Sequence, residues 1–254
     1  DFEQNSTDVA VKADGSFLVL YLDNLNCGGG GAGGADLCIK WYDANGIINA
    51  QSTVKGCNAL FIPKAEISPT GDYIIVWTYL GAQEDGGKIY CRMYAASYLQ
   101  IGADFVINDP VDNQINCQKP SLGIDGNGNF VVVWETDLNG NWDIYGKIFN
   151  SEGIPYQANF MINDDGGSSH QTSPAVDMLE DGSFVVTWTD TREGNNDIFA
   201  QRYDSKWNPV GNNFIVNDGG LTSNQSTPAI AFTPDGKFVI AWQDGRNGNN
   251  DIYA

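Results

Sequence analysis

The sequence predicts an all-β protein, a β-propeller of about five four-stranded antiparallel blades, and three observations lead to this prediction. The first is an internal repeat, seen most clearly in Asp-Gly-Ser-Phe-Val-Val-Thr-Trp at 181–188. The aromatic residues that open its copies are Phe17, Tyr73, Phe130, Phe184 and Phe238. Their spacings of 56, 57, 54 and 54 residues are typical of a tandem array of structural repeats.

The second observation is that each copy contains four strand-like runs. In the fourth copy these runs are 174–178, 184–188, 198–203 and 214–217, rich in β-branched and aromatic residues and bounded by Gly, Asn and Asp. Asp-Gly pairs beginning at Asp14, Asp181 and Asp235 predict two-residue hairpin turns. Proline stands ten residues before the opening aromatic in four copies, where we expect it to begin the first strand; the equivalent positions are Thr7, Pro63, Pro120, Pro174 and Pro228.

The third observation concerns the second run of each copy. Residues 130–134 and 238–242 are apolar at every position, so both faces of this strand must be covered, as the blades of a propeller cover one another. Small residues occupy three of the five equivalent positions in the first strand, which suits packing near a central axis. These positions are Ala10, Glu66, Gly123, Asp177 and Ala231.

The repeat boundaries predict a single domain over residues 1–254. Its blades span about 1–62, 63–119, 120–173, 174–227 and 228–254. The fifth copy stops at Ala254, before the rest of its third strand and all of its fourth, and residues 1–6 lead into the first blade. We therefore expect sequence beyond 254, a partner strand or membership of a larger ring, because an unfinished blade leaves an open edge.

Composition narrows the possible partners. The chain of 254 residues has 32 acidic and 13 basic side chains and a net charge of −19, which argues against a nucleic-acid partner. No run of about 18 apolar residues is present, so we expect no membrane insertion. The chain begins at Asp1 without an apolar leader, which suits a processed secreted protein or a fragment, and we expect an extracellular or cell-surface location.

Cysteines and glycosylation motifs leave alternatives open. None of the five cysteines recurs at a repeat position, and their disulfide pairing is undetermined; they are Cys27, Cys38, Cys57, Cys91 and Cys117. A disulfide between Cys27 and Cys38 would close the Gly-rich insertion at 27–36, which is either a lid or a tolerated surface loop. Cys91, inside a strand, is expected to be a small buried hydrophobe. Asn5 and Asn224 begin glycosylation motifs that chance explains equally well.

One loop of the third copy has the spacing of a calcium site. Asp137, Asn139, Asn141 and Asp143 present oxygen atoms at alternate positions around a glycine, which predicts calcium as a ligand. Related loops at 190–197 and 244–251 are one residue longer and contain an arginine. The alternative is that Asn, Asp and Gly are simply the residues that tight turns require.

Catalytic motifs are scarce, and we predict that the chain is not an enzyme. His170 is the only histidine, and the chain lacks the Gly-x-Ser-x-Gly, phosphate-loop and His-Glu-x-x-His motifs. Glu66 and Asp177 are acidic at equivalent positions near the expected axis. As an alternative they would be the acid and base of a glycoside hydrolase, joined by Asp125 and Glu135.

Tryptophans outside the repeated core positions favour a binding role instead. Trp142 and Trp207 fall in predicted turns, and Trp41 ends a third strand in an outer part of its blade. Exposed aromatic rings stack on sugars and anchor protein interfaces, so these three, with Glu66 and Asp177, are the predicted ligand-binding residues. The tryptophans at the repeated position are expected in the core; they are Trp77, Trp134, Trp188 and Trp242.

The repeat also resembles a known type. Residues 235–242 and 249–254, with 201–204 and 213–218 of the preceding copy, are similar to the propeller-type tandem repeats of large secreted surface proteins of bacteria and ciliates. The first two copies depart from that pattern at Tyr21, which replaces tryptophan, and at Lys88, which replaces aspartate. The resemblance implies an extracellular binding, adhesion or scaffold role without catalytic residues.

These observations together predict a non-catalytic binding or adhesion module that recognises a glycan or protein at the cell surface through loops of the propeller. Two alternatives remain: a structural subunit of a surface assembly or filament, and a propeller-fold glycoside hydrolase. No cofactor is assigned, and calcium is the one candidate.

Overall fold

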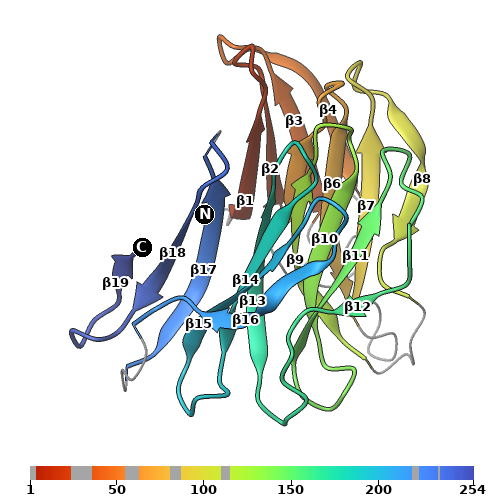
Figure 1. Ribbon diagram of the computed structural model, residues 1–254. Coiled ribbons are helices and arrows are strands. Elements are labelled where there is room, and N and C mark those ends of the chain that lie inside the picture. Colours follow the sequence, from red (N-terminus) through yellow and green to blue (C-terminus); the bar gives the residue numbers. More distant parts are fainter. Residues whose placement is uncertain are drawn as a thin grey trace. The chain divides into compact units, whose positions relative to one another are not determined.

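The computed structural model describes residues 4–23, 36–54, 63–80, 87–109, 115–218, 223–233 and 235–254, apart from the side chains of residues 4–6 and 80. These residues form five antiparallel sheets, of which four have four strands and one has three (Figure 1). The chain divides into two compact units, Asp1–Pro120 and Ser121–Ala254, and each is described by itself. In every sheet the strands lie side by side in chain order, as expected for propeller blades.

The first unit contains the first two blades. Its first sheet has the order β1-β2-β3-β4, formed by β1 (Gln4–Val11), β2 (Phe17–Asp23), β3 (Asp36–Tyr42) and β4 (Ile48–Val54). Its second sheet has the order β5-β6-β7-β8, formed by β5 (Lys64–Ile67), β6 (Tyr73–Leu80), β7 (Gly87–Tyr94) and β8 (Gln100–Val106).

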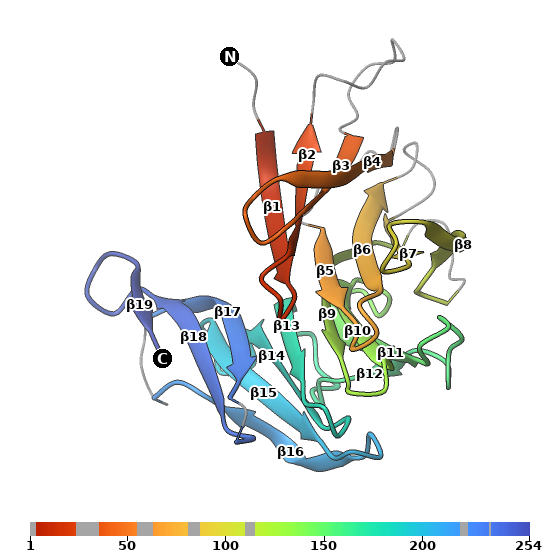
Figure 2. The ribbon, with the colours of Figure 1, turned by 90° about the horizontal axis from the view of Figure 1, so that it is seen from above.

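The second unit contains the remaining blades, and the first strand of its first sheet begins at the end of the first unit. That sheet comprises β9 (Cys117–Ile124), β10 (Phe130–Thr136), β11 (Asp143–Phe149) and β12 (Phe160–Met161). The next comprises β13 (Gln171–Met178), β14 (Phe184–Asp190), β15 (Asp197–Tyr203) and β16 (Pro209–Ile215). The last has three strands, β17 (Gln225–Phe232), β18 (Phe238–Asp244) and β19 (Asp251–Tyr253), and Figure 2 shows β17 beside β13.

The hairpins between first and second strands differ from the prediction in loop length. The N–H of Gly15 donates to the carbonyl of Lys12, and the N–H of Lys12 donates to the carbonyl of Ser16. Gly15 has φ +84°, and Gly182 occupies the equivalent place with φ +89°. Each loop is therefore a three-residue turn whose glycine forms a bulge, and the predicted two-residue turn is wrong, because Asp-Gly fills its last two positions.

Three of the four prolines lie inside the first strands instead of at their start, namely Pro120, Pro174 and Pro228, whereas Pro63 directly precedes β5. Pro174 is the fourth residue of β13 and lies within a register shift between Thr172 and Ala175. Ser173, before this proline, has φ +55°, and its N–H donates to Glu135 Oε2 at 2.6 Å. Proline is tolerated inside this strand because a bulge removes the need for its missing donor.

The prediction of a second strand that is buried on both faces is confirmed for residues 130–134 and is wrong for residues 238–242, since Val239 of β18 is 53% exposed. Every residue of β10 and of β14 is buried, including Trp134 and Trp188. In the third and fourth blades the aromatic that opens the second strand stacks on the aromatic that ends the third strand, with ring centroids 5.0 Å apart for Phe130 and Phe149 and 4.3 Å apart for Phe184 and Tyr203. This stack closes one end of these two sheets and supplies packing beyond simple area burial.

Some predictions on cysteines and glycosylation fall outside the described residues. Cys27, Cys57 and the insertion from 27 to 35 are among them, as is the side chain of Asn5. Cys91 is a fully buried thiol, as predicted, and burial raises its pKa. Asn224 is exposed, and its glycosylation stays a prediction.

Candidate functional site

Charged side chains gather on the first strands of the two blades in the first unit. Lys64 Nζ lies 3.1 Å from Asp8 Oδ1, and the N–H of Ala65 donates to Asp8 Oδ2 at 2.9 Å. Asp8 therefore connects β1 to β5 through one ion pair and one backbone hydrogen bond. Ala65 is buried, whereas Lys64 and Glu66 are half-buried on the opposite face, because alternate residues of a strand share a face. Two carboxylates and one ammonium group thus belong to adjoining first strands.

Asp8 and Lys64 were missed from the sequence, although a signal was present. Asp8 follows Thr7, and Lys64 follows Pro63, at the two equivalent positions directly after the proline site. The other three copies have small residues there, which are Ser121, Ala175 and Ala229. A charged pair at a position that is otherwise small is the departure that would have identified this cluster.

Asp177, predicted as the partner of Glu66, belongs to the second unit and has a structural task there. Its Oδ2 accepts the N–H of Phe232 at 2.6 Å, and its Oδ1 accepts the N–H of Met178 at 2.8 Å. Asp177 thereby links β13 to β17, much as Asp8 links two first strands in the other unit. Both of its oxygens are engaged by backbone donors.

Asp125 and Glu135, the other two acidic candidates, are also occupied by backbone groups. Asp125 Oδ1 accepts the N–H groups of Asn127 and Asn129, each at 2.8 Å, and so stabilises the turn after β9. Glu135 is buried and accepts the N–H of Ser173. The idea that these two residues assist hydrolysis is not supported, since each holds a turn or bulge in place.

The loop predicted to bind calcium does not fit the ion. Asp143 accepts hydrogen bonds from the amide nitrogens of Asn139 at 2.8 Å, Asn141 at 3.2 Å and Asn163 at 2.9 Å. Amide N–H groups therefore point at the carboxylate, where calcium would need oxygen ligands. Within the described ranges no group of three or more His, Cys, Asp or Glu residues could hold a metal. The prediction for Asp137, Asn139, Asn141 and Asp143 is corrected accordingly, and these residues form a hydrogen-bonded turn.

The longer loops of the fourth and fifth blades are organised by arginines. Asp190 is buried and lies 2.8 Å from Arg192. Burial would lower the pKa of Arg192, but hydrogen bonds with Asp190 and Asp164 raise it overall. In the next blade, the hydrogen bond from Arg246 at 2.6 Å holds the pKa of Asp244 below its ordinary value. These pairs explain the arginines that set the two loops apart from the third copy.

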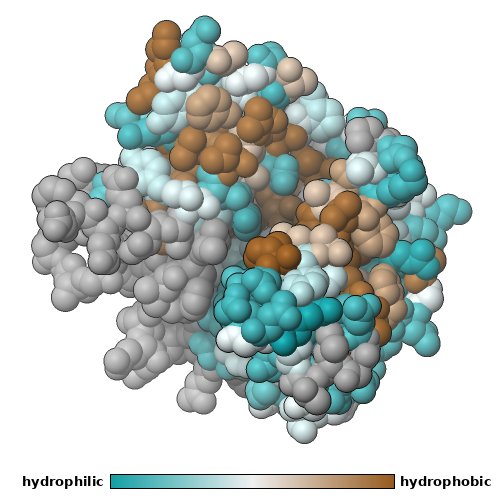
Figure 3. Space-filling model, turned by 90° about the vertical axis from the view of Figure 1, so that its left-hand side faces the viewer, coloured by the Kyte–Doolittle hydropathy of each residue, from teal (hydrophilic) through white to brown (hydrophobic). Residues whose placement is uncertain are grey.

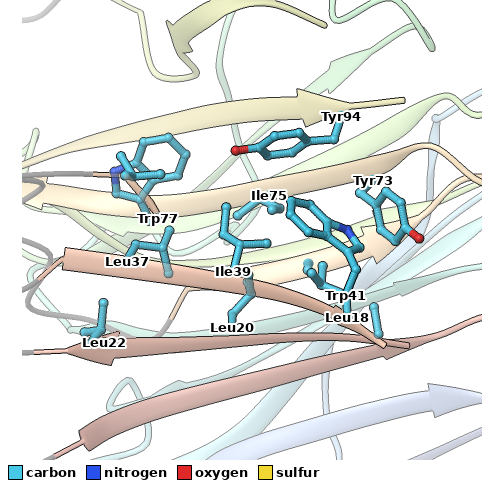
Figure 4. Close-up of a cluster of buried hydrophobic side chains, with 13 residues drawn as sticks. Leu18, Leu20, Leu22, Leu37, Ile39, Trp41, Tyr73, Ile75, Trp77 and Tyr94 are labelled. Atoms are coloured by element: carbon cyan, nitrogen blue, oxygen red, sulfur yellow. The ribbon is translucent and has the colours of Figure 1, made fainter. Parts of the chain in front are cut away.

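Trp41 is not an exposed binding residue. Only 1% of its surface is exposed, and its ring lies 4.9 Å from that of Tyr94 (Figure 4) and 5.5 Å from that of Tyr98. Both tyrosines belong to the neighbouring blade, which covers the end of β3. The prediction for Trp41 is wrong because an outer position in one blade is an inner position once the next blade packs on it.

The other two tryptophans lie in turns, as predicted, and are half-buried. The backbone N–H of Trp142 donates to His170 Nδ1 at 3.2 Å. Trp207 has φ +66°, an unusual conformation for a bulky residue, and its ring centroid is 4.7 Å from that of exposed Tyr156. Ligand binding by Trp142 and Trp207 stays a prediction.

Comparison with solved structures places this chain beside several sugar-cleaving enzymes. An α-L-arabinanase of Penicillium chrysogenum in complex with arabinobiose is 12% identical, with a TM-score of 0.63 over 97% of this chain and 74% of that one. An α-L-arabinofuranosidase of Fusarium graminearum, also with arabinobiose, is 12% identical, with a TM-score of 0.59 over 97% and 75%. An endo-arabinase of Bacteroides thetaiotaomicron is 12% identical, with a TM-score of 0.56 over 98% and 92%. Neither the protein-family models nor the curated protein sequences contain a match.

At these identities the likeness shows the fold, which is a β-propeller of four four-stranded sheets and one three-stranded sheet in the described residues. The expectation that the chain is not an enzyme is overturned, because the similar structures include arabinanases and arabinofuranosidases, which are glycoside hydrolases. The non-catalytic assignment depended on absent motifs, and carboxylate chemistry leaves no compact motif in a sequence. Among the described residues, no helix is long and apolar enough to cross a membrane.

Proposed function

We propose that this chain is a glycoside hydrolase of β-propeller fold that cleaves an arabinose-containing polysaccharide outside the cell. The observation that carries the proposal is the cluster of Asp8, Lys64 and Glu66 in the first unit, set in a fold that arabinan-cleaving enzymes share. Hydrolysis of a glycosidic bond needs two carboxyl groups, one to protonate the leaving oxygen and one to act as nucleophile or to activate water. The cluster supplies both groups on adjoining strands.

The two carboxyl groups differ in their surroundings, and we assign their roles from this difference. Asp8 has the Lys64 ammonium group 3.1 Å away and one backbone N–H 2.9 Å away, so one of its two donors is a side chain, whereas both donors to Asp177 are backbone groups. Asp8 is therefore assigned as the nucleophile or base. Glu66, which is half-buried and two residues beyond Lys64, is assigned as the acid. The ammonium group of Lys64 also offers a donor to sugar hydroxyls.

A hydrolysis assay tests the proposal. The chain is incubated with arabinan, arabinoxylan and control glucans, and the oligosaccharides released are separated by chromatography. We expect arabinose-containing products from the wild-type chain and a loss of about 100-fold or more in kcat for Glu66→Gln and Asp8→Asn. Glu152→Gln, an exposed carboxyl in a turn of the second unit, is the matched control and should retain full activity.

Thermal melting of each variant separates catalysis from folding. Glu66→Gln should leave the melting temperature close to that of the wild type, whereas Asp8→Asn will lower it, because Asp8 also joins two strands. The anomeric configuration of the first product, read by NMR, then distinguishes retention from inversion. Absence of hydrolysis on every polysaccharide, or full activity in Glu66→Gln, would remove the proposal.

A further inference from the structure

A loop contact between the third and fourth blades carries an indole ring and an imidazole ring. The backbone N–H of Trp142, in the loop before β11, donates to His170 Nδ1 at 3.2 Å, and the carbonyl of Trp142 accepts the N–H of Gln171 at 2.7 Å. The side chain of Asn141 donates to the carbonyl of Ser169 at 2.9 Å. Trp142 is half-buried and His170 is exposed, so both side chains reach the solvent.

The fourth and fifth blades make the same contact without either ring. The N–H of Asn196 donates to Asn224 Oδ1 at 3.1 Å, and the carbonyl of Asn196 accepts the N–H of Gln225 at 2.8 Å. The side chain of Asn195 donates to the carbonyl of Ser223 at 3.1 Å. Three hydrogen bonds of one contact are therefore reproduced, group for group, in the other.

Comparison of the two contacts separates the structural task from the rings. Asn196 takes the place of Trp142, and Asn224 takes the place of His170. In both contacts the first residue supplies only its backbone N–H and carbonyl, and the second supplies one acceptor atom of its side chain. A pair of asparagines meets these needs. The contact between blades therefore does not require an indole or an imidazole.

The two rings provide two hydrogen-bond donors that the protein does not use. Because Nδ1 of His170 is an acceptor, the neutral imidazole carries its proton on Nε2. In the described part of the chain, neither this Nε2–H nor the indole N–H of Trp142 has a hydrogen-bond partner. An aromatic ring together with unused donors is suited to a sugar, whose C–H face packs on the ring while its hydroxyl groups accept hydrogen bonds.

The charges around Trp142 and His170 favour a neutral ligand. Arg192, in the adjoining loop, is already paired with Asp190 at 2.8 Å and with Asp164 at 2.6 Å. The net charge of −19 opposes an anionic ligand. An ammonium ligand is disfavoured too, because it offers donors and no acceptor to the two N–H groups. A polyhydroxyl compound offers acceptors without a charge.

We propose that Trp142 and His170 form an additional sugar-binding site, at which a neutral sugar residue of a polysaccharide packs on the indole and accepts a hydrogen bond from His170 Nε2. The choice of an arabinose-containing polysaccharide as the ligand rests on the proposed function. The site belongs to the second unit, whereas the cluster of Asp8, Lys64 and Glu66 belongs to the first. The task of the additional site is to hold the polymer, and bond cleavage does not involve it.

The single histidine of the chain allows binding at this site to be observed directly. Arabino-oligosaccharides are titrated into the Glu66→Gln variant, so that hydrolysis does not consume the ligand, and the imidazole resonances of His170 are followed by NMR. We expect these resonances to shift in a saturable manner, because the sugar binds to the ring that produces them. In a variant that also carries Trp142→Asn, the shift should be lost over the same concentration range.

Substitutions copied from the fourth and fifth blades remove the rings and keep the loop contact. Trp142→Asn and His170→Asn introduce the residues that stand at the equivalent positions, Asn196 and Asn224, so the hydrogen bonds between blades persist. In the same background, we expect the Kd for arabinan, measured by affinity electrophoresis, to rise about tenfold in Trp142→Asn and about threefold in His170→Asn. Melting temperatures should stay close to that of the parent. Val210→Asn, which removes an exposed apolar side chain of the same unit, is the control and should leave the Kd unchanged.

Three results would overturn the proposal. His170 resonances that do not shift with any arabino-oligosaccharide would show that no sugar binds at this loop. An unchanged Kd in Trp142→Asn would show that the indole does not contact the polysaccharide. A large fall in the melting temperature of that variant would assign the indole to packing between blades. Failure of the hydrolysis assay with a normal shift of the His170 resonances would remove the proposed function and leave the sugar-binding site in place.

Discussion

Trp188 lies in the core of the second unit with none of its surface exposed, and its indole N–H donates to Asp190 Oδ2 at 2.8 Å. Trp142, in a turn of the preceding blade, is only half-buried. The two residues are chemically identical, so their contributions to stability differ through position alone. A buried indole contributes both apolar area and, here, a hydrogen bond to a buried carboxylate.

Trp188→Ala should therefore lower the free energy of unfolding by about 3 to 5 kcal/mol, the usual cost of removing a large buried aromatic. Trp142→Ala should cost about 1 kcal/mol or less. Urea unfolding of both variants checks this expectation. Equal losses would show that the turn tryptophan is as deeply packed as the core one.

Position within the repeat could be predicted from the sequence, but contacts between blades could not. Trp188 was assigned to the core because its position recurs in four copies. Trp41 has no such recurrence, and its burial depends on Tyr94 and Tyr98, which lie more than fifty residues away in sequence. The ion pair of Asp8 with Lys64 was not predicted either, because it joins two different repeats.

Several turns contain a residue with positive φ, and this residue is not always glycine. Gly140 has φ +89° and Gly166 has no positive φ, and a Cβ added at either would meet no atom within 4 Å. Alanine substitutions at these two glycines therefore differ only in the backbone conformation that the new residue must adopt, because neither adds a steric clash. Trp207 and Tyr98, with φ of +66° and +69°, tolerate the same left-handed region while packing on the preceding blade.

We expect Gly140→Ala to destabilise the chain by about 1 kcal/mol, because the left-handed conformation disfavours a Cβ. Gly166→Ala should fall within about 0.5 kcal/mol of the wild type. Differential scanning calorimetry of the two variants measures the difference. A neutral Gly140→Ala would mean that this turn changes conformation without cost.

The loop at 244–251 makes stability depend on pH. The hydrogen bond from Arg246 lowers the pKa of Asp244 in the folded state, so the folded chain binds this proton less readily than the unfolded chain. A depressed pKa contributes stability above the unfolded value of about 3.9, and that contribution is lost as pH falls through the folded pKa.

Asp244→Asn should accordingly be less stable than the wild type at pH 7, and the gap should narrow as the pH falls from about 5 towards 2. Urea unfolding at several pH values follows the gap. A difference that stayed constant over this range would show that the Asp244 charge does not contribute to folding stability.

At the scale of the whole molecule, charge and apolar surface act in opposite directions. The net charge of −19 opposes compaction through repulsion, while buried strands such as β10 and β14 favour it. Apolar side chains also remain outside, among them Val239 at 53% and Ile252 at 73% exposure. Figure 3 shows hydrophobic atoms exposed among hydrophilic ones on one face.

Added salt should therefore raise the melting temperature between about 10 and 150 mM NaCl, because it screens repulsion over a Debye length of about 8 to 30 Å. An uncharged osmolyte at matched osmolality is the control for excluded-volume effects. A melting temperature that fell with salt would mean that attractive pairs such as Arg192 with Asp190 outweigh the repulsion.

The sequence was sufficient to predict the sheets and their order, because strand period, turn residues and repeat spacing are local properties. It was insufficient for the candidate site. Asp125, Asp143 and Asp177 were considered as functional carboxylates, and the structure shows each of them accepting N–H groups. Whether a carboxylate is available for chemistry depends on which donors the fold brings to it, and local spacing does not encode those donors.

The bulge at the proline of β13 also has a consequence for the duplication of such repeats in a gene. The N–H of Ser173 is satisfied by Glu135 of the preceding blade, and the N–H of Thr227 by Thr189 at 3.2 Å in the same manner. The third and fourth blades thus each supply an acceptor to the first strand of the next blade. A duplicated repeat carries its own donor, the backbone N–H at the bulge. The acceptor must come from the preceding blade, from a side chain near the end of its second strand. Tandem copying meets this condition automatically, whereas exchange between distant repeats has to meet it by chance.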